Sequence, residues 1–249
     1  MKKILIIGDS HTQKLSYCID NVIIKNIHNE KYVYSEQQYR SMYQNKNNEY
    51  SRMHDSLFLF KNDNLELYIS GHPGRSALNF NYDEFGSGSQ KEILNLSIDE
   101  SFTVMPWLGY IDIRNWIPQK NINSYKNSKE VVKIYVDNTL KKFSNNKIIF
   151  IEPLPQFITY ITSRWMNFSS DPANEFEERY QAHLDFVQEL KEYCLELNLP
   201  EPISPSKILD TDMIETYMQP KKPIKLFLND HMTEEYYEKI LFNILKLED

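Results

Sequence analysis

The residues best suited to chemistry stand near the start of the sequence. The apolar run Lys3–Ile7 has the length of a buried strand, and Gly8-Asp9-Ser10 follows it just before a helical pattern opens. Ligands of α/β folds bind at the carboxyl ends of the strands. A serine on a tight strand-to-helix turn exposes its hydroxyl there, and backbone N–H groups of the following helix can stabilise an oxyanion. Ser10 is therefore the first candidate for a nucleophile.

Short apolar runs bounded by turn residues predict the strands, and apolar residues at helical spacing predict the helices. The expected strands are Lys3–Ile7, Leu65–Ser70, Ser101–Met105, Lys147–Glu152 and, more weakly, Lys225–Leu228. The expected helices run from about Ser128 to Phe143, from Phe176 to Leu197 and from Tyr237 to Leu245. Strands that alternate with helices imply a mainly parallel α/β sheet with right-handed crossovers.

The length of the chain fits one large domain. Its 249 residues suffice for a sizeable core, and no Pro/Gly/Ser-rich linker divides them, so we expect a single domain over residues 1–249. The segment Asn29–Asp63 is polar, rich in Tyr and Asn, and without clear period. We expect it to form an irregular insertion or helical excursion near the mouth of the site.

Charge and composition argue against several classes of protein. The net charge is −7 and the isoelectric point about 5.5, with dispersed basic residues, so a nucleic-acid partner is not expected. The first residues lack a signal-peptide pattern, and the run Ile4–Ile7 is too short to span a bilayer. We therefore expect a cytoplasmic protein with no membrane partner. Cys18 and Cys194 are too few and too far apart to predict a disulfide framework.

The loops that follow the strands converge at one edge of such a sheet, and polar groups and glycines concentrate in them. These loops are Gly8–His11, Gly71–Ser76, Trp107–Asn115, Pro153–Pro155 and Asn229–Thr233. Their polarity beside apolar strands is a stronger signal than any single motif. Their histidines and acids show no tight ligand spacing, so neither a metal nor another cofactor is expected.

Four short blocks, taken in order, resemble the SGNH/GDSL hydrolase superfamily. They are Gly8-Asp9-Ser10, the Gly-rich turn after the second strand, Gly109-Tyr110-Ile111-Asp112, and His231 before the last helix. The resemblance spans essentially the whole chain. It implies a three-layer α/β/α sandwich with a mainly parallel, flavodoxin-like central sheet, and a serine-dependent acyl-ester hydrolase. The loop Gly109–Arg114 also resembles a subgroup found in polysaccharide and capsule contexts.

The resemblance assigns roles to individual residues. Ser10 matches the nucleophile and His231 the general base, and the backbone N–H groups of Ser10 and Gly74 would hold the oxyanion. A glycine at position 74 lets the backbone approach the substrate with no Cβ in the way. Asp9 would order the turn by accepting backbone N–H bonds, and Asp112 would order its own loop.

Two histidines of the loops have alternative roles. His11 directly follows the candidate nucleophile. It either lines the site with a hydrogen-bonding group or supports the start of the helix. His72 poses the same alternatives.

The chain departs from the family pattern in its third block. The family has Gly-x-Asn-Asp, whose Asn side chain donates to the oxyanion, whereas Ile111 stands at that position here and cannot donate. Loss of one such donor typically costs on the order of 10²–10³ in rate. Asn115 or Arg114 could substitute, and Arg114 could instead clamp an anionic part of the substrate.

The acid of the triad is also displaced. The family places it three residues before the histidine, where this chain has Leu228. Asp230 adjoins His231, and adjacent side chains usually diverge. Asp212, Asp210 or a backbone carbonyl could hold the imidazole instead, and a Ser–His dyad is also workable.

Three functions follow from these residues. The favoured one is an esterase or deacetylase acting on an O-acylated carbohydrate or small ester. The second is a carbohydrate O-acyltransferase, in which a sugar hydroxyl replaces water at the same Ser–His site. The third is a non-catalytic binding module that retains the fold, motivated by Ile111 and Leu228. The expected partner is a small-molecule or glycan ester, and the oligomeric state is left open.

Overall fold

The computed structural model describes part of the chain in detail. The described residues are 1–9, 11–12, 14–15, 56–61, 63–72, 76–78, 98–113, 127–154, 172–209, 227–228, 231–232 and 234–246. In 56–61, 172–179, 209, 227–228, 231–232 and 234–235 only the backbone is described.

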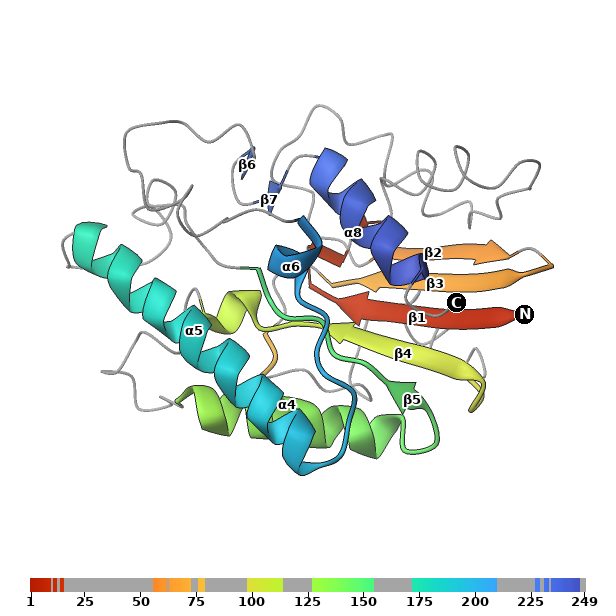
Figure 1. Cartoon of the computed structure of the whole chain (residues 1–249), viewed down its shortest axis with the longest axis horizontal. Helices are drawn as coiled ribbons and strands as arrows, with labels where there is room; N and C mark the ends of the chain where they lie inside the picture. Colours follow the sequence, from red (N-terminus) through yellow and green to blue (C-terminus); the bar gives the residue numbers. More distant parts are fainter. Residues whose placement is uncertain are drawn as a thin grey trace.

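The described strands form one mainly parallel sheet (Figure 1). Its order is β2 (Ser56–Lys61), β3 (Leu65–Gly71), β1 (Lys2–Gly8), β4 (Phe102–Trp107) and β5 (Lys147–Ile148). All pairs are parallel except β2 with β3, which is antiparallel. Beyond β5, Ile151 pairs in parallel with Ile203. The parallel strands thus follow the flavodoxin-like order, in which the first strand lies between the second and third.

The fourth expected strand, Lys147–Glu152, is interrupted beside a proline. The ladder assigned to β5 ends at Ile148, yet the Ile149 and Ile151 N–H groups still donate to Val104 and Pro106 carbonyls, at 3.0 and 2.9 Å. Pro106 has no N–H to donate in return, so one bond of the ladder is missing there. The chain nevertheless runs alongside β4 as far as Ile151.

Two expectations from the sequence need correction. The end of the segment Asn29–Asp63 is not irregular, because residues 56–61 form β2 at the edge of the sheet; residues 29–55 lie outside the described residues. The weak strand expected at Lys225–Leu228 appears as β6 (Phe227–Leu228). It pairs antiparallel with β7 (His231–Met232) in a separate two-stranded sheet.

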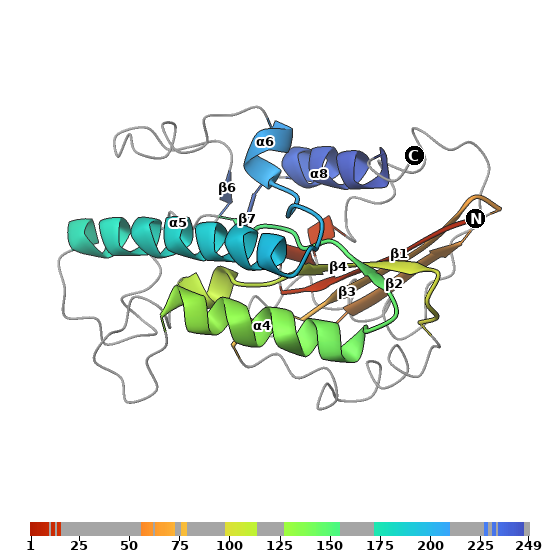
Figure 2. The same ribbon diagram turned by 60° about the horizontal axis from the view of Figure 1, so that its bottom comes forward.

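Helices cover both faces of the main sheet. Figure 2 shows α6 (Pro205–Leu209) and α8 (Glu234–Lys246) on one side of the sheet and α4 (Ser128–Lys142) on the other. The helix α5 (Pro172–Glu196) packs along α4. Asn127 starts α4 with a capping box, in which its side chain accepts the Glu130 N–H and the Glu130 carboxylate accepts the Asn127 N–H. The three layers expected from the resemblance are therefore present.

Alternate residues of β1 supply the two cores. Ile4 and Ile6 pack in the cluster that contains the buried face of α8, whereas Leu5 and Ile7 pack in the cluster with α4 and α5. This follows from the period of two in a strand and from burial of both faces of a parallel sheet. The strand that leads to Ser10 is thus fixed from both sides.

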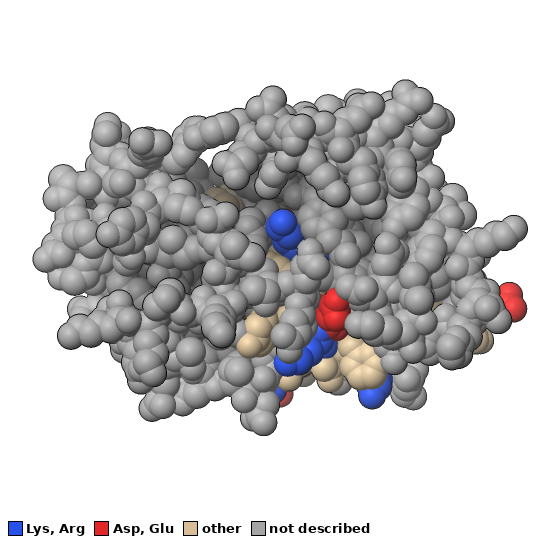
Figure 3. Space-filling model, turned by 90° about the horizontal axis from the view of Figure 1, so that it is seen from above, with Lys and Arg blue, Asp and Glu red and all other residues tan. Residues whose placement is uncertain are grey.

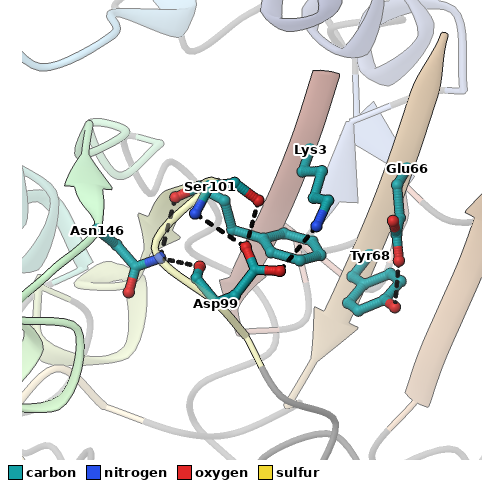
Figure 4. Close-up of polar contacts among 7 residues, drawn as sticks. Lys3, Glu66, Tyr68, Asp99, Ser101 and Asn146 are labelled. Carbon is teal, nitrogen blue, oxygen red and sulfur yellow. Dashed lines mark hydrogen bonds and ion pairs between the residues drawn. The ribbon is translucent and has the colours of Figure 1, made fainter. Parts of the chain in front are cut away.

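A polar network joins the amino-terminal ends of the parallel strands (Figure 4). Lys3 Nζ donates to the Asp99 carboxylate at 2.8 Å, which also accepts the Ser101 N–H at 2.9 Å. Asn146 donates to the carbonyls of Asp99 and Phe102, joining the ends of β4 and β5. The hydrogen bond from Lys3 lowers the pKa of Asp99 to about 2. These amino-terminal strand ends lie opposite the carboxyl ends, which carry the candidate site.

On the one face in Figure 3, the described lysine side chains are few, and an acidic side chain lies near some of them. No helix in the described ranges has the length and apolar character needed to cross a bilayer.

Candidate active site

The turn after β1 is held by its neighbours on both sides. The His72 N–H donates to the Gly8 carbonyl at 2.7 Å, and the Asp9 N–H donates to the Trp107 carbonyl at 3.2 Å. A Cβ at Gly8 would overlap the Trp107 carbonyl oxygen and the Thr12 hydroxyl, so only glycine fits there. Hydrogen bonds therefore join the loops after β1, β3 and β4 just before the candidate nucleophile, Ser10.

Asp9 is buried within this turn. Its carboxylate accepts the His11 N–H at 2.9 Å and a backbone N–H bond from Tyr110. Burial raises the pKa of Asp9 to about 7; the bond from His11 opposes the rise and the charge of Asp112 adds to it. The side chain bonds its own turn and the loop after β4, which is the geometry of a residue that orders backbone. The His11 N–H is thereby occupied by Asp9.

Asp112 joins the loop after β4 to the segment after β3. Its two carboxylate oxygens accept the N–H groups of Ala77 and Leu78, at 2.6 and 3.1 Å. The side chain is fully buried, and burial raises its pKa to about 6 against the lowering effect of those bonds. Asp112 therefore orders backbone between two of the site loops.

Gly109 gives the same loop its shape. Its φ of +115° lies in a region that other residues rarely adopt, and a Cβ there would stand 2.7 Å from the Phe186 ring of α5. The Ile113 N–H then donates to the Gly109 carbonyl at 2.9 Å, closing a helical turn. Ile111 lies in this turn and is half-buried, with no polar atom in its side chain.

The two loop histidines both make buried hydrogen bonds. His11 Nδ1 shares a bond of 2.6 Å with the Tyr237 hydroxyl of α8, and its ring meets Tyr110 edge-on at a centroid distance of 4.2 Å. His72 Nε2 shares a bond of 2.7 Å with the Ser70 hydroxyl of β3. These contacts do not decide between the two roles expected for His11, which are to line the site and to support the start of the helix.

Several candidate residues are not described. Ser10, Gly74, Arg114, Asn115 and Asp230 lie outside the described residues, as do Asp210 and Asp212. His231 is described by its backbone alone, in β7, where it pairs with Leu228. The meeting of the Ser10 hydroxyl and the His231 imidazole stays a prediction. Among the described residues, no group of three His, Cys, Asp or Glu side chains is placed to bind a metal.

The described atoms nevertheless bring the two ends of the sequence together. His11 is the next residue after Ser10, and Tyr237 stands in the helix that begins just after His231. The hydrogen bond between them spans 226 positions of sequence, and both side chains are 1 % exposed. The turn that carries the candidate nucleophile and the segment that carries the candidate base thus lie on neighbouring elements.

The sequence gives no sign that Tyr237 contacts the candidate site. Helical periodicity places Tyr237 only in the apolar face of the last helix, because it treats tyrosine as an apolar residue. Its hydroxyl is what reaches the site loops. The Trp107 indole, at the end of β4, is buried and donates to the Glu152 carbonyl at 3.0 Å, so it supports the fold.

Solved structures share this fold across nearly the whole chain. A member of the lipolytic protein G-D-S-L family from Veillonella parvula matches with a TM-score of 0.55 and 14% identity, covering 99% of this chain and 98% of that one. A lipase/acylhydrolase from Enterococcus faecalis matches with a TM-score of 0.51 and 13% identity, covering 100% and 95%. A mutant of an acetyl-xylooligosaccharide esterase from Geobacillus matches with a TM-score of 0.50 and 10% identity, covering 98% and 93%.

These likenesses define the class of fold. No family model matches the sequence, and no curated protein matches it either. The protein shares the three-layer α/β/α fold of these lipolytic enzymes, which is the fold that the resemblance implied.

Proposed function

We propose that the protein is a serine-dependent acyl-ester hydrolase with Ser10 as nucleophile and His231 as general base. The observation that carries the proposal is the hydrogen bond between His11 and Tyr237, because it joins the elements next to those two residues. The buried bonds of Asp9 and Asp112 support it further, since they fasten the three loops at the edge where α/β folds bind ligands.

The reaction follows from the residues in order. The Ser10 oxygen attacks the ester carbonyl carbon while its proton passes to the His231 imidazole. The N–H groups of Ser10 and Gly74 hold the resulting oxyanion. The bond to the leaving oxygen then breaks, and His231 returns the proton to the departing alcohol. Water repeats the sequence on the acyl-enzyme and releases the acid and the free serine.

Ordered backbone is what this site requires from its surroundings. A donor helps only when it is already aimed at the position of the developing charge. The His11 N–H donates to the Asp9 carboxylate, so it is not one of the proposed oxyanion donors. His72 fixes the start of the loop that leads to Gly74, through its N–H bond to Gly8 and its ring bond to Ser70.

The proposed substrate is an O-acylated carbohydrate or another small ester. The acetyl-xylooligosaccharide esterase that shares the fold supports a sugar acetate, and so does the likeness of the loop Gly109–Arg114 to carbohydrate-associated relatives. Asp230 is proposed to orient the imidazole, with a Ser–His dyad as the alternative. Arg114 and Asn115 are proposed substrate contacts.

One observation favours a second candidate, a binding module without turnover. Ile111 occupies the position of the third oxyanion donor and has no polar side-chain atom. A site with one donor fewer is slower by roughly 10²–10³. Such a protein would bind acylated glycans without cleaving them.

A labelling experiment tests the proposal. The purified protein is treated with a fluorophosphonate probe, and the labelled peptide is identified by mass spectrometry. We expect labelling at Ser10, together with release of acetate from acetylated xylo-oligosaccharides and 4-nitrophenyl acetate. Ser10→Ala should abolish both, whereas Ser144→Ala, an exposed serine after α4, should change neither.

The possible results separate the candidates. Absence of label and of acetate release would overturn the hydrolase and favour the binding module. Acetyl transfer to an added glycan, in place of acetate release, would redefine the protein as an acyltransferase using the same serine.

A further inference from the structure

Tyr237 and His11 form a buried polar pair that joins the apolar face of α8 to the turn after β1. Both side chains are 1 % exposed, and Tyr237 stands in the core cluster with Ile240, Leu241 and Ile244 of α8. A buried hydroxyl needs a hydrogen-bond partner, and that of Tyr237 shares a bond of 2.6 Å with His11 Nδ1. The pair spans the interface between the first turn and the last helix.

Three contacts restrain His11 in different directions. Its N–H donates to the Asp9 carboxylate, its ring rests edge-on against Tyr110, and its Nδ1 meets the Tyr237 hydroxyl at 2.6 Å. Asp9 and His11 are the two chain neighbours of Ser10, so these contacts restrain the residues on either side of it. The other end of the pair is on α8, so this hydrogen bond couples the position of α8 to that of His11.

We propose that Tyr237 is a positioning residue, which sets the distance between the Ser10 hydroxyl and the His231 imidazole through its hydrogen bond to His11. This inference rests on the proposed hydrolase function. Tyr237 touches neither the substrate nor the reacting atoms in this role. A misplacement of about 1 Å between reacting groups can cost up to roughly 10² in rate.

The consequence is a selective loss of turnover. In Tyr237→Phe the ring still fills the core, but the bond to His11 is gone. We expect kcat for 4-nitrophenyl acetate and the rate of fluorophosphonate labelling to fall about 10- to 100-fold, with KM changed less than about twofold. A purely structural role would lower the melting temperature and leave kcat per folded molecule unchanged.

A matched control removes a tyrosine hydroxyl elsewhere. Tyr68 donates to Glu66 at 2.7 Å on β3, toward the amino-terminal edge of the sheet (Figure 4). Tyr68→Phe loses one side-chain hydrogen bond as well, and its kcat and labelling rate should match those of the unaltered protein.

A second pair of variants keeps the test valid if Tyr237→Phe folds poorly. In His11→Asn the amide stands where Nδ1 stood and can still bond the Tyr237 hydroxyl, whereas His11→Leu removes that bond. His11→Asn should retain clearly more activity per folded molecule than His11→Leu. Circular dichroism gives the folded fraction of each variant.

The outcomes distinguish this inference from the proposed function. If the unaltered protein is not labelled at Ser10, the hydrolase proposal and this inference are both overturned. If it is labelled and Tyr237→Phe keeps its full kcat, or the two His11 variants are equally active, the positioning role alone is overturned. A large fall in kcat at constant KM, with His11→Asn above His11→Leu, supports it.

Discussion

The Asp112 carboxylate holds the backbone N–H of Ala77 at 2.6 Å, although the two residues are 35 positions apart in the sequence. The same carboxylate accepts the Leu78 N–H; the bond to Ala77 is buried and the bond to Leu78 is partly buried. The loops after β3 and β4 therefore cannot move independently. The proposed oxyanion donor Gly74 stands in the chain between His72, whose N–H donates to the Gly8 carbonyl, and Ala77, so both ends of its loop are held.

Substitution of Asp112 should destabilise the fold, and more so in Asp112→Ala than in Asp112→Asn. Asp112→Ala leaves the buried Ala77 N–H and the partly buried Leu78 N–H without this acceptor, and a buried N–H without a partner costs about 1–3 kcal/mol, so we expect the free energy of unfolding to fall by about 2 kcal/mol. Asp112→Asn keeps one acceptor oxygen and should lose about half as much. Urea denaturation measures both.

The exposed Asp137 of α4 provides the comparison for these variants. It pairs with Lys133 at the surface, so Asp137→Ala should change the free energy of unfolding by less than about 0.5 kcal/mol. Equal losses in Asp112→Ala and Asp137→Ala would contradict the anchoring role of Asp112.

Asp9 predicts a dependence of stability on pH. Its pKa is about 7 in the folded protein and 3.8 for an aspartate in water, because burial disfavours the charged form. From about pH 4 to about pH 7 the folded state keeps a proton that the unfolded state has released. The free energy of unfolding therefore falls as the pH rises through that window, by up to about 1.4 kcal/mol per pH unit for this group.

Comparison of Asp9→Asn with the unaltered protein isolates this effect. The amide cannot ionise, so the variant should gain stability relative to the unaltered protein as the pH rises from about 4 to about 7. His183 acts in the opposite sense, because burial lowers its pKa to about 4, but it is present in both proteins and cancels. A difference that is flat or of opposite sign would contradict the assignment. Urea denaturation at several pH values gives the measurement.

Much of the fold could be predicted because the information is local. The period of apolar residues predicts α4 to within a residue, since it indicates a helix over Ser128–Phe143 and the helix runs Ser128–Lys142. The strand β2 was missed because its short apolar run lies in a polar segment, and only antiparallel pairing with β3 stabilises it. No periodicity within 56–61 reveals that partner.

The candidate site divides in the same way. Gly8, Asp9 and Asp112 could be singled out from their places after strands. Their partners could not, because Tyr110 and Ala77 meet the two acids only through the folded sheet, as Tyr237 meets the serine turn. Side-chain hydroxyls at apolar positions, such as that of Tyr237, leave no trace in a hydrophobic pattern.

Gly109 should tolerate no side chain, for two separable reasons. Gly109→Ala places a Cβ at a φ of +115° and within 2.7 Å of the Phe186 ring. Backbone strain of this kind costs about 1–3 kcal/mol, and the overlap adds to it. We expect a loss near the upper end of that range, measured by thermal and urea unfolding.

A double-mutant cycle separates the two terms at Gly109. Phe186→Leu removes the ring atoms that the new Cβ would meet, so the double variant should lose less stability than the sum of the two single losses. The remainder reflects the backbone conformation. Strict additivity would mean that the ring and the Cβ do not meet.

Ile111 predicts a gain of activity on substitution. It occupies the third oxyanion position of the resembled superfamily, lies half-exposed in the turn after Gly109, and carries no donor. Ile111→Asn supplies an amide N–H at that position. If the proposed hydrolase is limited by the missing donor, kcat for 4-nitrophenyl acetate should rise at least about tenfold, within the roughly 10²–10³ that one donor is worth. Ile111→Leu, which changes shape without adding a donor, should not raise it. An increase in both variants would point to altered access, and no increase in either would contradict the idea that a missing donor limits the rate.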